Sequence, residues 1–210
     1  MFAKARWFGL LALVAVIATS AVAQKNEIAG GIGRTFISDE TIKRGPIPIP
    51  NNVVSFGHGT TWEVNYARHL WHRGFLALDA EVPVVGNPDE DLSSGNGAIP
   101  SEYSSVFVTP AARIRFFAEN AVQLWVSGGG GFGHWTMSNT LVYGGVNPGP
   151  KGKNSGVAQA GGGLDLRHWK HFGFRLAARD FYVPKLPLNV TTTSSHHHNI
   201  VVSGGVIFSF

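Results

Sequence analysis

The segment from Phe172 to Phe181, FGFRLAARDF, decides the fold. Its large apolar residues recur at alternate positions, and two arginines occupy the positions between them. Successive side chains of a β-strand point to opposite faces, so this spacing predicts a strand with one apolar and one charged face. The apolar face holds Phe172, Phe174, Leu176 and Ala178, and the other face holds Arg175 and Arg179.

The same alternation recurs from one end of the chain to the other. The final strand carries an apolar stripe on alternate residues and ends on the aromatic residue Phe210. The segments near 27–37 and 122–134 are rich in glycine and alternate less cleanly. We therefore expect eight strands, near residues 27–37, 60–70, 75–85, 104–117, 122–134, 159–167, 172–181 and 199–210.

The connections between these segments alternate in length. Three are short turns, LWHRG, FAENA and HWKHF, and four are long polar stretches near residues 38–59, 86–103, 136–156 and 183–198. Strict alternation places all long loops at one end and all short turns at the other. The sequence thus predicts an all-β, eight-stranded antiparallel up-and-down β-barrel.

Three features favour a transmembrane barrel over a soluble β-sandwich. The segments run for about ten residues, which matches the ~9–11 needed to cross a bilayer with a tilted strand. Charged residues make up only 14% of the chain, against about 25% in soluble domains. Each arginine facing lipid would cost roughly 2–4 kcal/mol. We therefore expect a lumen filled by paired charges, namely Glu63, Asp79, Glu81, Arg113, Arg115, Asp165, Arg175 and Arg179.

The N-terminus has the layout of a cleaved secretory signal peptide. Basic residues precede an apolar run, and Ala21-Val22-Ala23 offers a cleavage site before Gln24. This divides the chain into a signal peptide, residues 1–23, and one barrel domain, residues 24–210. Without the signal peptide the chain has 15 basic and 13 acidic residues, a net charge of only +2. Because this charge is small, we expect no nucleic-acid partner. The absence of cysteine excludes disulfides and thiolate metal sites.

The segments LALDAEVPVV, FVTPAARIRFF, FRLAARDF and GGVIFSF, together with the signal peptide, resemble the small bacterial outer-membrane β-barrels of the OmpA/OmpX type. The resemblance implies residence in the cell outer membrane, with four long external loops and three short periplasmic turns. It implies contact with outer-membrane lipids and lipopolysaccharide. It also implies that the barrel-assembly machinery recognises the last strand, which ends at Phe210 and closes the barrel on the strand near Glu27–Ile37.

We expect a non-enzymatic protein with a structural or surface-interaction role, in which the long loops contact an extracellular partner. A narrow porin or transporter for small or hydrophobic molecules is the alternative. A lipid-modifying enzyme is the third hypothesis, with His134 and Ser138 in HWTMSN as its candidate residues, but the stretch offers no carboxylate to orient the histidine. The sequence accordingly assigns no catalytic, cofactor-binding or metal-binding residue.

Several smaller motifs have structural explanations. The run GGGGFG at Gly128–Gly133 lacks the features of a phosphate loop and is expected to let strands curve. His196–His198 alternate along a strand edge, so tight metal binding is not expected. A four-histidine metal site is also not expected, because His69, His72, His168 and His171 lie in separate turns. Interfacial aromatic girdles are predicted from Trp71, Phe116, Phe117, Trp169, Phe172 and Tyr182.

Overall fold

The computed structural model describes residues 25–43, 52–95, 98–184, 186 and 188–210. The expected signal peptide and the PIPIP segment at 46–50 lie outside these residues. No helix in the described part of the chain is long and apolar enough to span a membrane. The strands are β1 (Asn26–Ile37), β2 (Glu40–Thr41), β3 (Val53–Phe56), β4 (Thr60–Arg73), β5 (Leu76–Ser94), β6 (Glu102–Val108), β7 (Ala111–Phe116), β8 (Val122–Met137), β9 (Gly152–Leu166), β10 (Phe172–Pro184) and β11 (His196–Ser209).

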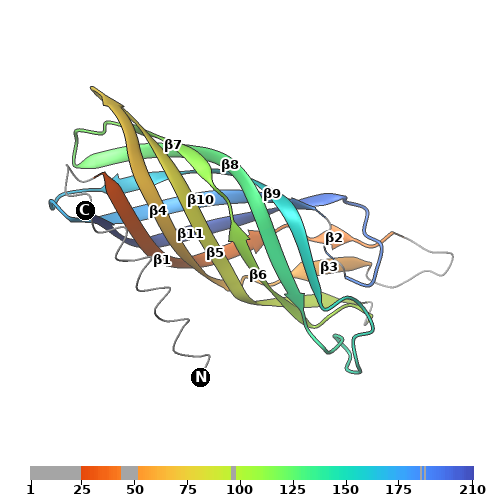
Figure 1. The fold of residues 1–210 in the computed structure, drawn as a ribbon. Coiled ribbons are helices and arrows are strands. Elements are labelled where there is room, and N and C mark those ends of the chain that lie inside the picture. Colours follow the sequence, from red (N-terminus) through yellow and green to blue (C-terminus); the bar gives the residue numbers. More distant parts are fainter. Residues whose placement is uncertain (1–24, 44–51, 96–97, 185, 187) are drawn as a thin grey trace, which may run out of the picture.

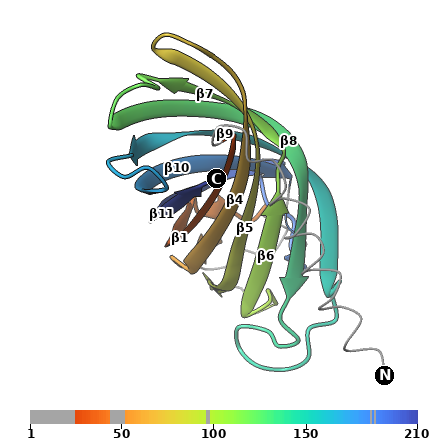
Figure 2. The ribbon, with the colours of Figure 1, turned by 60° about the vertical axis from the view of Figure 1, so that its left-hand side comes forward.

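The strands close into one antiparallel ring (Figures 1 and 2). β1 pairs with β4 on one side and with β11 on the other, so the first and last strands seal the barrel. β6 and β7 together occupy one position in the ring, between β5 and β8, and are separated only by Thr109 and Pro110. The ring therefore has eight positions, and the predicted eight-stranded antiparallel barrel is confirmed.

The two ends of the barrel differ as the sequence predicts. The three short turns, near residues 74–75, 117–121 and 167–171, lie together with Phe210 at one end. The long connections lie at the other end, where β2 and β3 also project (Figure 1). We call these the turn end and the loop end.

The second long connection is shorter than the sequence suggests. β5 continues to Ser94 and β6 begins at Glu102, so much of the stretch 86–103 is strand rather than loop. The register shifts between Asn87 and Glu90, which marks a bulge around Pro88. Proline and aspartate in NPDED read as loop residues, but a bulge accommodates them within an extended strand.

Outward side chains on the turn-end half of the barrel are apolar. Ile32, for example, is 73% exposed on the outer wall. The exposed aromatic residues Trp71, Phe117, Trp169 and Phe172 lie at the turn end, whereas Phe116 is half-buried. We call this outer surface the apolar belt; its members include Ile28, Ile32, Trp62, Val64, Ile114, Leu124, Val126, Phe132, Phe174, Leu176, Val202, Val206 and Phe208.

The polarity of the two faces reverses towards the loop end, which alternation along the sequence does not predict. On β8 the outward residues change from Leu124 and Val126 near the turn end to His134 and Thr136 near the loop end. The inward residues change from Gln123 to the large apolar residues Trp135 and Met137. The loop-end half therefore has the pattern of a water-exposed barrel, with a polar outside and an apolar inside.

The inside of the loop-end half is an apolar core, which we call the cap core. Phe107 stacks on Phe181 with ring centroids 4.8 Å apart and meets Trp135 edge-on at 5.5 Å. Other buried members are Ile37, Ile42, Val54, Phe56, Val85, Leu92, Ile99, Tyr103, Met137, Val157, Val183, Leu186, Leu188 and Val201.

Buried polar groups accompany the cap core. Glu90 accepts hydrogen bonds from Asn87 Nδ2 at 2.8 Å and from the Gly59 amide at 3.1 Å. Burial raises the pKa of the Glu90 carboxyl above its ordinary value despite these two donors. Desolvation likewise raises the pKa of the Tyr103 hydroxyl, and the Glu90 and Glu40 carboxylates add to this rise.

Glycines on the inward face of β8 permit close packing at the β6–β7 break. A Cβ on Gly131 would lie 2.0 Å from the Val108 carbonyl oxygen, and one on Gly129 would lie 2.2 Å from that of Pro110. No larger residue fits either position without moving a neighbouring strand. The glycine run therefore allows local curvature of the wall, as predicted.

Candidate functional site

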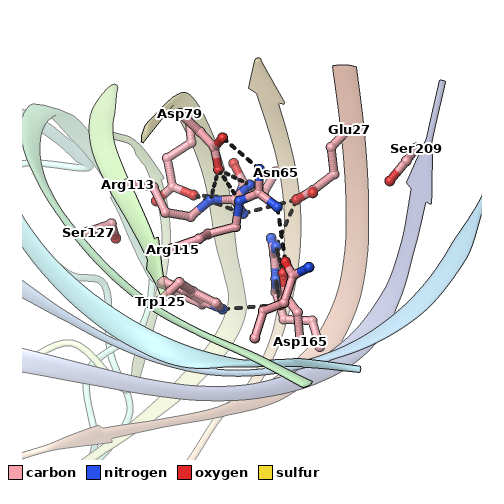
Figure 3. A network of polar contacts seen from close by, with 12 residues as sticks. Glu27, Asn65, Asp79, Arg113, Arg115, Trp125, Ser127, Asp165 and Ser209 are labelled. Carbon is pink, nitrogen blue, oxygen red and sulfur yellow. Dashed lines mark hydrogen bonds and ion pairs between the residues drawn. The ribbon is translucent and has the colours of Figure 1, made fainter. Parts of the chain in front are cut away.

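The lumen of the turn-end half holds ten charged side chains, which we call the charge network. Figure 3 shows part of it, including Glu27, Asp79, Arg113, Arg115 and Asp165. The structure brings together all eight residues that the sequence predicted. It adds Glu27 and Arg167, so five carboxylates face five guanidinium groups. The members are Glu27, Glu63, Asp79, Glu81, Asp165, Arg113, Arg115, Arg167, Arg175 and Arg179.

Glu27 is the centre of the layer nearest the turn end. Its Oε1 lies 2.9 Å from Arg113 Nη1 and 2.7 Å from Arg175 Nη2. Arg167 contacts the other oxygen of Glu27. Arg175 also reaches Asp165 Oδ2 at 2.7 Å, so these chains form a continuous ionic cluster across the barrel.

Asp79 anchors the opposite wall of this layer. Its Oδ2 accepts from Arg113 Nε at 2.9 Å and from Arg115 Nε at 2.7 Å. The ring nitrogen Nδ1 of His69 lies 2.9 Å from Asp79 Oδ1. Arg115 extends the cluster to Gln123, whose Oε1 accepts from Nη1 at 3.0 Å.

Arg179 forms the layer nearest the cap core. Its Nε donates to Glu63 Oε1 and its Nη1 to Glu81 Oε1, both at 2.8 Å. Asn65 Nδ2 donates to Glu81 Oε2 and Ser203 Oγ to Glu63 Oε2, also at 2.8 Å each. Ionised groups in this buried layer are therefore paired and hydrogen-bonded, which a buried charge requires.

Trp125 joins the two layers. The guanidinium carbons of Arg175 and Arg179 lie 5.3 Å and 4.9 Å from the centroid of its ring. Its Nε1 donates to Asp165 Oδ1 at 3.1 Å. Cation–π contacts of this kind add to the ionic pairing and fix the two arginines in place.

The charge network and the cap core fill the described lumen one above the other. A cavity of about 330 Å³ lies at the turn end, and Glu27, Asp79 and Arg113 form part of its lining. A second space, of about 10 Å³, lies beside Arg175 and Ser203. The described lumen thus holds packed side chains, and the larger cavity lies at its turn end.

The structure separates the three consecutive histidines by face. His197 points inward, where its Nδ1 lies 3.2 Å from Glu40 Oε1. His196 and His198 point outward, and both contact the Tyr182 ring, at centroid distances of 4.9 Å and 5.1 Å. The three imidazoles therefore do not share one face of the strand.

The four turn-end histidines have different polar or ring partners. His69 binds Asp79, and His72 meets the His69 ring edge-on at 6.1 Å and lies 3.7 Å from Glu119 Oε1. His171 Nδ1 lies 3.0 Å from the Ser209 carbonyl oxygen, and His168 packs edge-on against Trp169. Within the residues that the structure describes, no group of three or more histidines and carboxylates is placed to hold a metal ion.

Polar contacts tie three of the loops together at the loop end. Asn189 Nδ2 donates to Asn147 Oδ1 at 2.8 Å and to the Ala98 carbonyl oxygen at 3.2 Å. Asn147 Nδ2 in turn donates to the Ser138 carbonyl oxygen at 2.8 Å. These bonds link residues 98, 147 and 189 from separate loops into one platform.

His134 and Ser138, the candidate pair from HWTMSN, are not in contact in the structure. The hydroxyl of Ser138 lies 3.0 Å from those of Ser101 and Thr140. His134 instead contacts Thr136 and Asn154 on the outer wall. The structure therefore does not bring together the two residues that the third hypothesis would need, since Ser138 lies beyond the end of β8 and bonds to other loop hydroxyls.

Comparison with known proteins identifies the fold. No protein-family model and no curated protein matches the sequence. Neisserial surface protein A is similar over 88% of this chain and 97% of its own, with 11% identity and a TM-score of 0.52. OprG from Pseudomonas aeruginosa covers 89% and 95%, with 13% identity and a TM-score of 0.53. The outer membrane enzyme PagL covers 85% and 97%, with 12% identity and a TM-score of 0.43. The barrel thus has the fold of small outer-membrane proteins.

Proposed function

We propose that this chain is an integral outer-membrane β-barrel with a closed lumen and a structural or surface-interaction role. The apolar belt carries the proposal, because a wall of exposed side chains such as Ile32, Phe174 and Leu176 is unstable in water and suits hydrocarbon. The charge network lies on the opposite face of the same strands, enclosed in the lumen and away from the apolar belt. Similarity in fold to two outer-membrane proteins supports the same placement.

The proposed orientation puts the turn end in the periplasm and the loop end outside the cell. The apolar belt then contacts the acyl chains of outer-membrane lipids and lipopolysaccharide, and the cap core stands above the hydrocarbon. The last strand, β11, pairs along its length with β1 and β10 and ends beside Phe210. We propose that the barrel-assembly machinery recognises this strand before the ring closes.

Cell fractionation combined with a heat-modifiability gel tests this placement. We expect the chain in the outer-membrane fraction, and we expect its unheated band to migrate differently from its boiled band because the folded barrel resists detergent. A water-soluble, monomeric product obtained without detergent would contradict the proposal. The same experiment tests removal of residues 1–23, since cleavage lowers the mass by the signal peptide.

The loop platform is the proposed contact surface for an extracellular partner. Asn147 and Asn189 hold three loops in one arrangement, so a partner would meet a surface that is already ordered. Tyr143 and Val146 are strongly exposed beside Gly144 and Gly145, both of which have positive φ. At this tight tip the side chain of Tyr143 is exposed and available to contact a partner.

Transport is the alternative function, and it predicts a measurable current or flux. Because paired charges and apolar residues fill the described lumen, we expect no steady large conductance when the purified protein is added to planar bilayers. Uptake of small or hydrophobic molecules into liposomes should equal that of protein-free vesicles. A stable open channel, or uptake above that background, would favour the transporter.

A further inference from the structure

The cavity of about 330 Å³ at the turn end has the size of a compact ligand site, since small ligands usually occupy sites of about 300–1,000 Å³. Its floor belongs to the charge network, where Arg113 pairs with both Glu27 and Asp79. Much of its wall comes from the start of β1 and from the two short turns that follow β7 and β9 (Figure 1). The cavity is therefore framed by the folded ring itself.

Positive charge exceeds negative charge in the lining of this cavity. Three carboxylates line it, those of Glu27, Asp79 and Glu119. Three arginines of the charge network and the two lysines Lys25 and Lys170 line it as well. Five cationic groups against three carboxylates leave a surplus of two positive charges, even when the histidine in the lining is neutral.

Three donors in the lining are not engaged by the protein. Within the part of the chain that the structure describes, the ammonium groups of Lys25 and Lys170 make no hydrogen bond or ion pair. Arg167 binds three other side chains through its Nη atoms, but its Nε is a buried donor without a partner among the described residues. A buried donor that lacks an acceptor is unfavourable, so an acceptor atom of a ligand would stabilise it.

The protein surface around the cavity also carries positive charge. Arg68 and Arg73 are exposed at the turn end, outside the cavity lining. The exposed carboxylate of Glu119 lies 3.7 Å from His72 Nε2 through its Oε1. Charges of one sign around a concave site raise the local concentration of ligands of the opposite sign. The turn end should therefore attract anions.

We propose that this cavity binds the phosphate group of a small organic phosphate monoester, with Lys25, Lys170 and Arg167 as its binding residues. Such a group carries a charge of about −1.5 to −2 at neutral pH, which is close to the positive surplus of the lining. It also presents three strong acceptor oxygens in one compact group, and the lining offers three donors that the protein leaves unused. A single carboxylate would neutralise only half of the surplus.

The aromatic rim of the cavity suits the organic part of such a ligand. Trp169 and Phe172 line the cavity and are also exposed, so apolar surface adjoins the basic groups. Trp169 packs edge-on against Phe174 of the apolar belt, with ring centroids 6.1 Å apart. In the proposed orientation two sources supply this chemistry: a soluble phosphate ester of the periplasm, and the head group of a lipid whose acyl chains lie on the apolar belt.

This binding site adds to the proposed closed barrel and does not open its lumen. The ligand would bind at the turn end, below the paired layers of the charge network, so binding requires no path through them. The site follows from the geometry of the barrel alone, and the membrane placement decides only where the ligand comes from.

Calorimetric titration of the full chain in non-ionic detergent micelles with glycerol phosphate tests the site. We expect saturable binding of one ligand per chain. The double variant Lys25→Met with Lys170→Met should raise the dissociation constant by at least about 10-fold, since each lost hydrogen bond joins two charged groups. Both lysines are exposed, so we expect this variant to fold, and a heat-modifiability gel checks that it does.

A matched variant separates the cavity from the general charge of the turn end. Arg68→Met with Arg73→Met also removes two positive charges from this end, but neither residue lines the cavity. We expect its dissociation constant to stay within about twofold of wild type, because exposed charges outside the cavity contribute only a screened attraction. Equal weakening by both double variants would overturn the site and leave a diffuse attraction of anions.

Arg167→Lys tests the guanidinium donor. Lysine keeps a positive charge beside Glu27 and Asp165, but it has no donor in place of Nε. We therefore expect a folded barrel whose dissociation constant for glycerol phosphate is several-fold higher than that of wild type. An unchanged dissociation constant would overturn the role of Arg167 in binding.

Competition identifies the chemical group that is bound. Inorganic phosphate should displace glycerol phosphate. Succinate at the same concentration should displace clearly less, because it spreads its two charges over two separate carboxylates. Equal displacement by succinate and inorganic phosphate would overturn the assignment to a phosphate group.

Short-chain phosphatidic acid, a phosphate monoester, distinguishes the two sources when it is added to the micelles. Displacement of glycerol phosphate by this lipid, and not by short-chain phosphatidylglycerol, which is a phosphate diester, would assign the site to a lipid head group. Displacement by neither lipid would assign it to a soluble ester. If the folded wild-type chain binds neither glycerol phosphate nor phosphatidic acid, the proposal is wrong. Absence from the outer membrane on fractionation is the separate failure of the proposed function.

Discussion

Replacing Arg175 with methionine is expected to lower the free energy of unfolding by about 3–5 kcal/mol, the usual result of removing one partner of a buried ionic group. Arg175 is 4% exposed and binds both Glu27 and Asp165. Without it these two buried carboxylates share one guanidinium fewer. Urea unfolding of the protein refolded into lipid vesicles, followed by tryptophan fluorescence, measures the change.

Two further variants make this result specific. Arg73→Met removes an exposed arginine of the same size at the turn end and should change stability by about 0.5 kcal/mol or less. The double variant Arg175→Met with Asp165→Asn removes one charge of each sign, so it should recover part of the loss. A loss below about 1 kcal/mol for Arg175→Met would mean that water, rather than Arg175, solvates these carboxylates.

The ring and most of the charge network were predictable because both follow from period-two alternation. Each of the eight predicted charges lies opposite an apolar stripe, and an apolar outer wall leaves only the lumen for charge. Glu27 was missed although it shares the inward face of β1 with Ala29 and Gly31, because these small residues weaken the contrast between the two faces. Arg167 shares the parity of Asp165 and is the last residue of the predicted strand 159–167, but its place next to the turn HWKHF kept it out of the predicted set.

The reversal of polarity was not predictable from alternation alone. Trp125 and Trp135 lie on the same face of β8, the first within the charge network and the second within the cap core. Parity fixes which residues share a face, but the medium outside the wall decides which face is apolar. On β8 the outward residues change from apolar to polar between Phe132 and His134. The register of β8 with its neighbours β6 and β9 sets how far along the barrel this change lies.

The cap core supplies the second large effect. Trp135→Ala is expected to cost about 3–5 kcal/mol of unfolding free energy, as for other buried tryptophan side chains. Trp135 is 1% exposed and packs edge-on against Phe107, which stacks on Phe181, so its removal leaves a cavity that these rings cannot fill without leaving their present contacts. Urea unfolding of the vesicle-bound protein measures this loss.

The control distinguishes an apolar plug from a water-filled channel. Trp71→Ala removes an exposed tryptophan of the apolar belt and should cost clearly less, since it leaves no cavity inside the barrel. If the loop-end lumen were wetted, Trp135→Ala would cost as little as Trp71→Ala. Because Arg179 still binds Glu63 and Glu81 beneath the new cavity, Trp135→Ala should destabilise the barrel and yet leave planar bilayers without a steady current. A current in this variant would show that the cap core, rather than the charge network, closes the lumen.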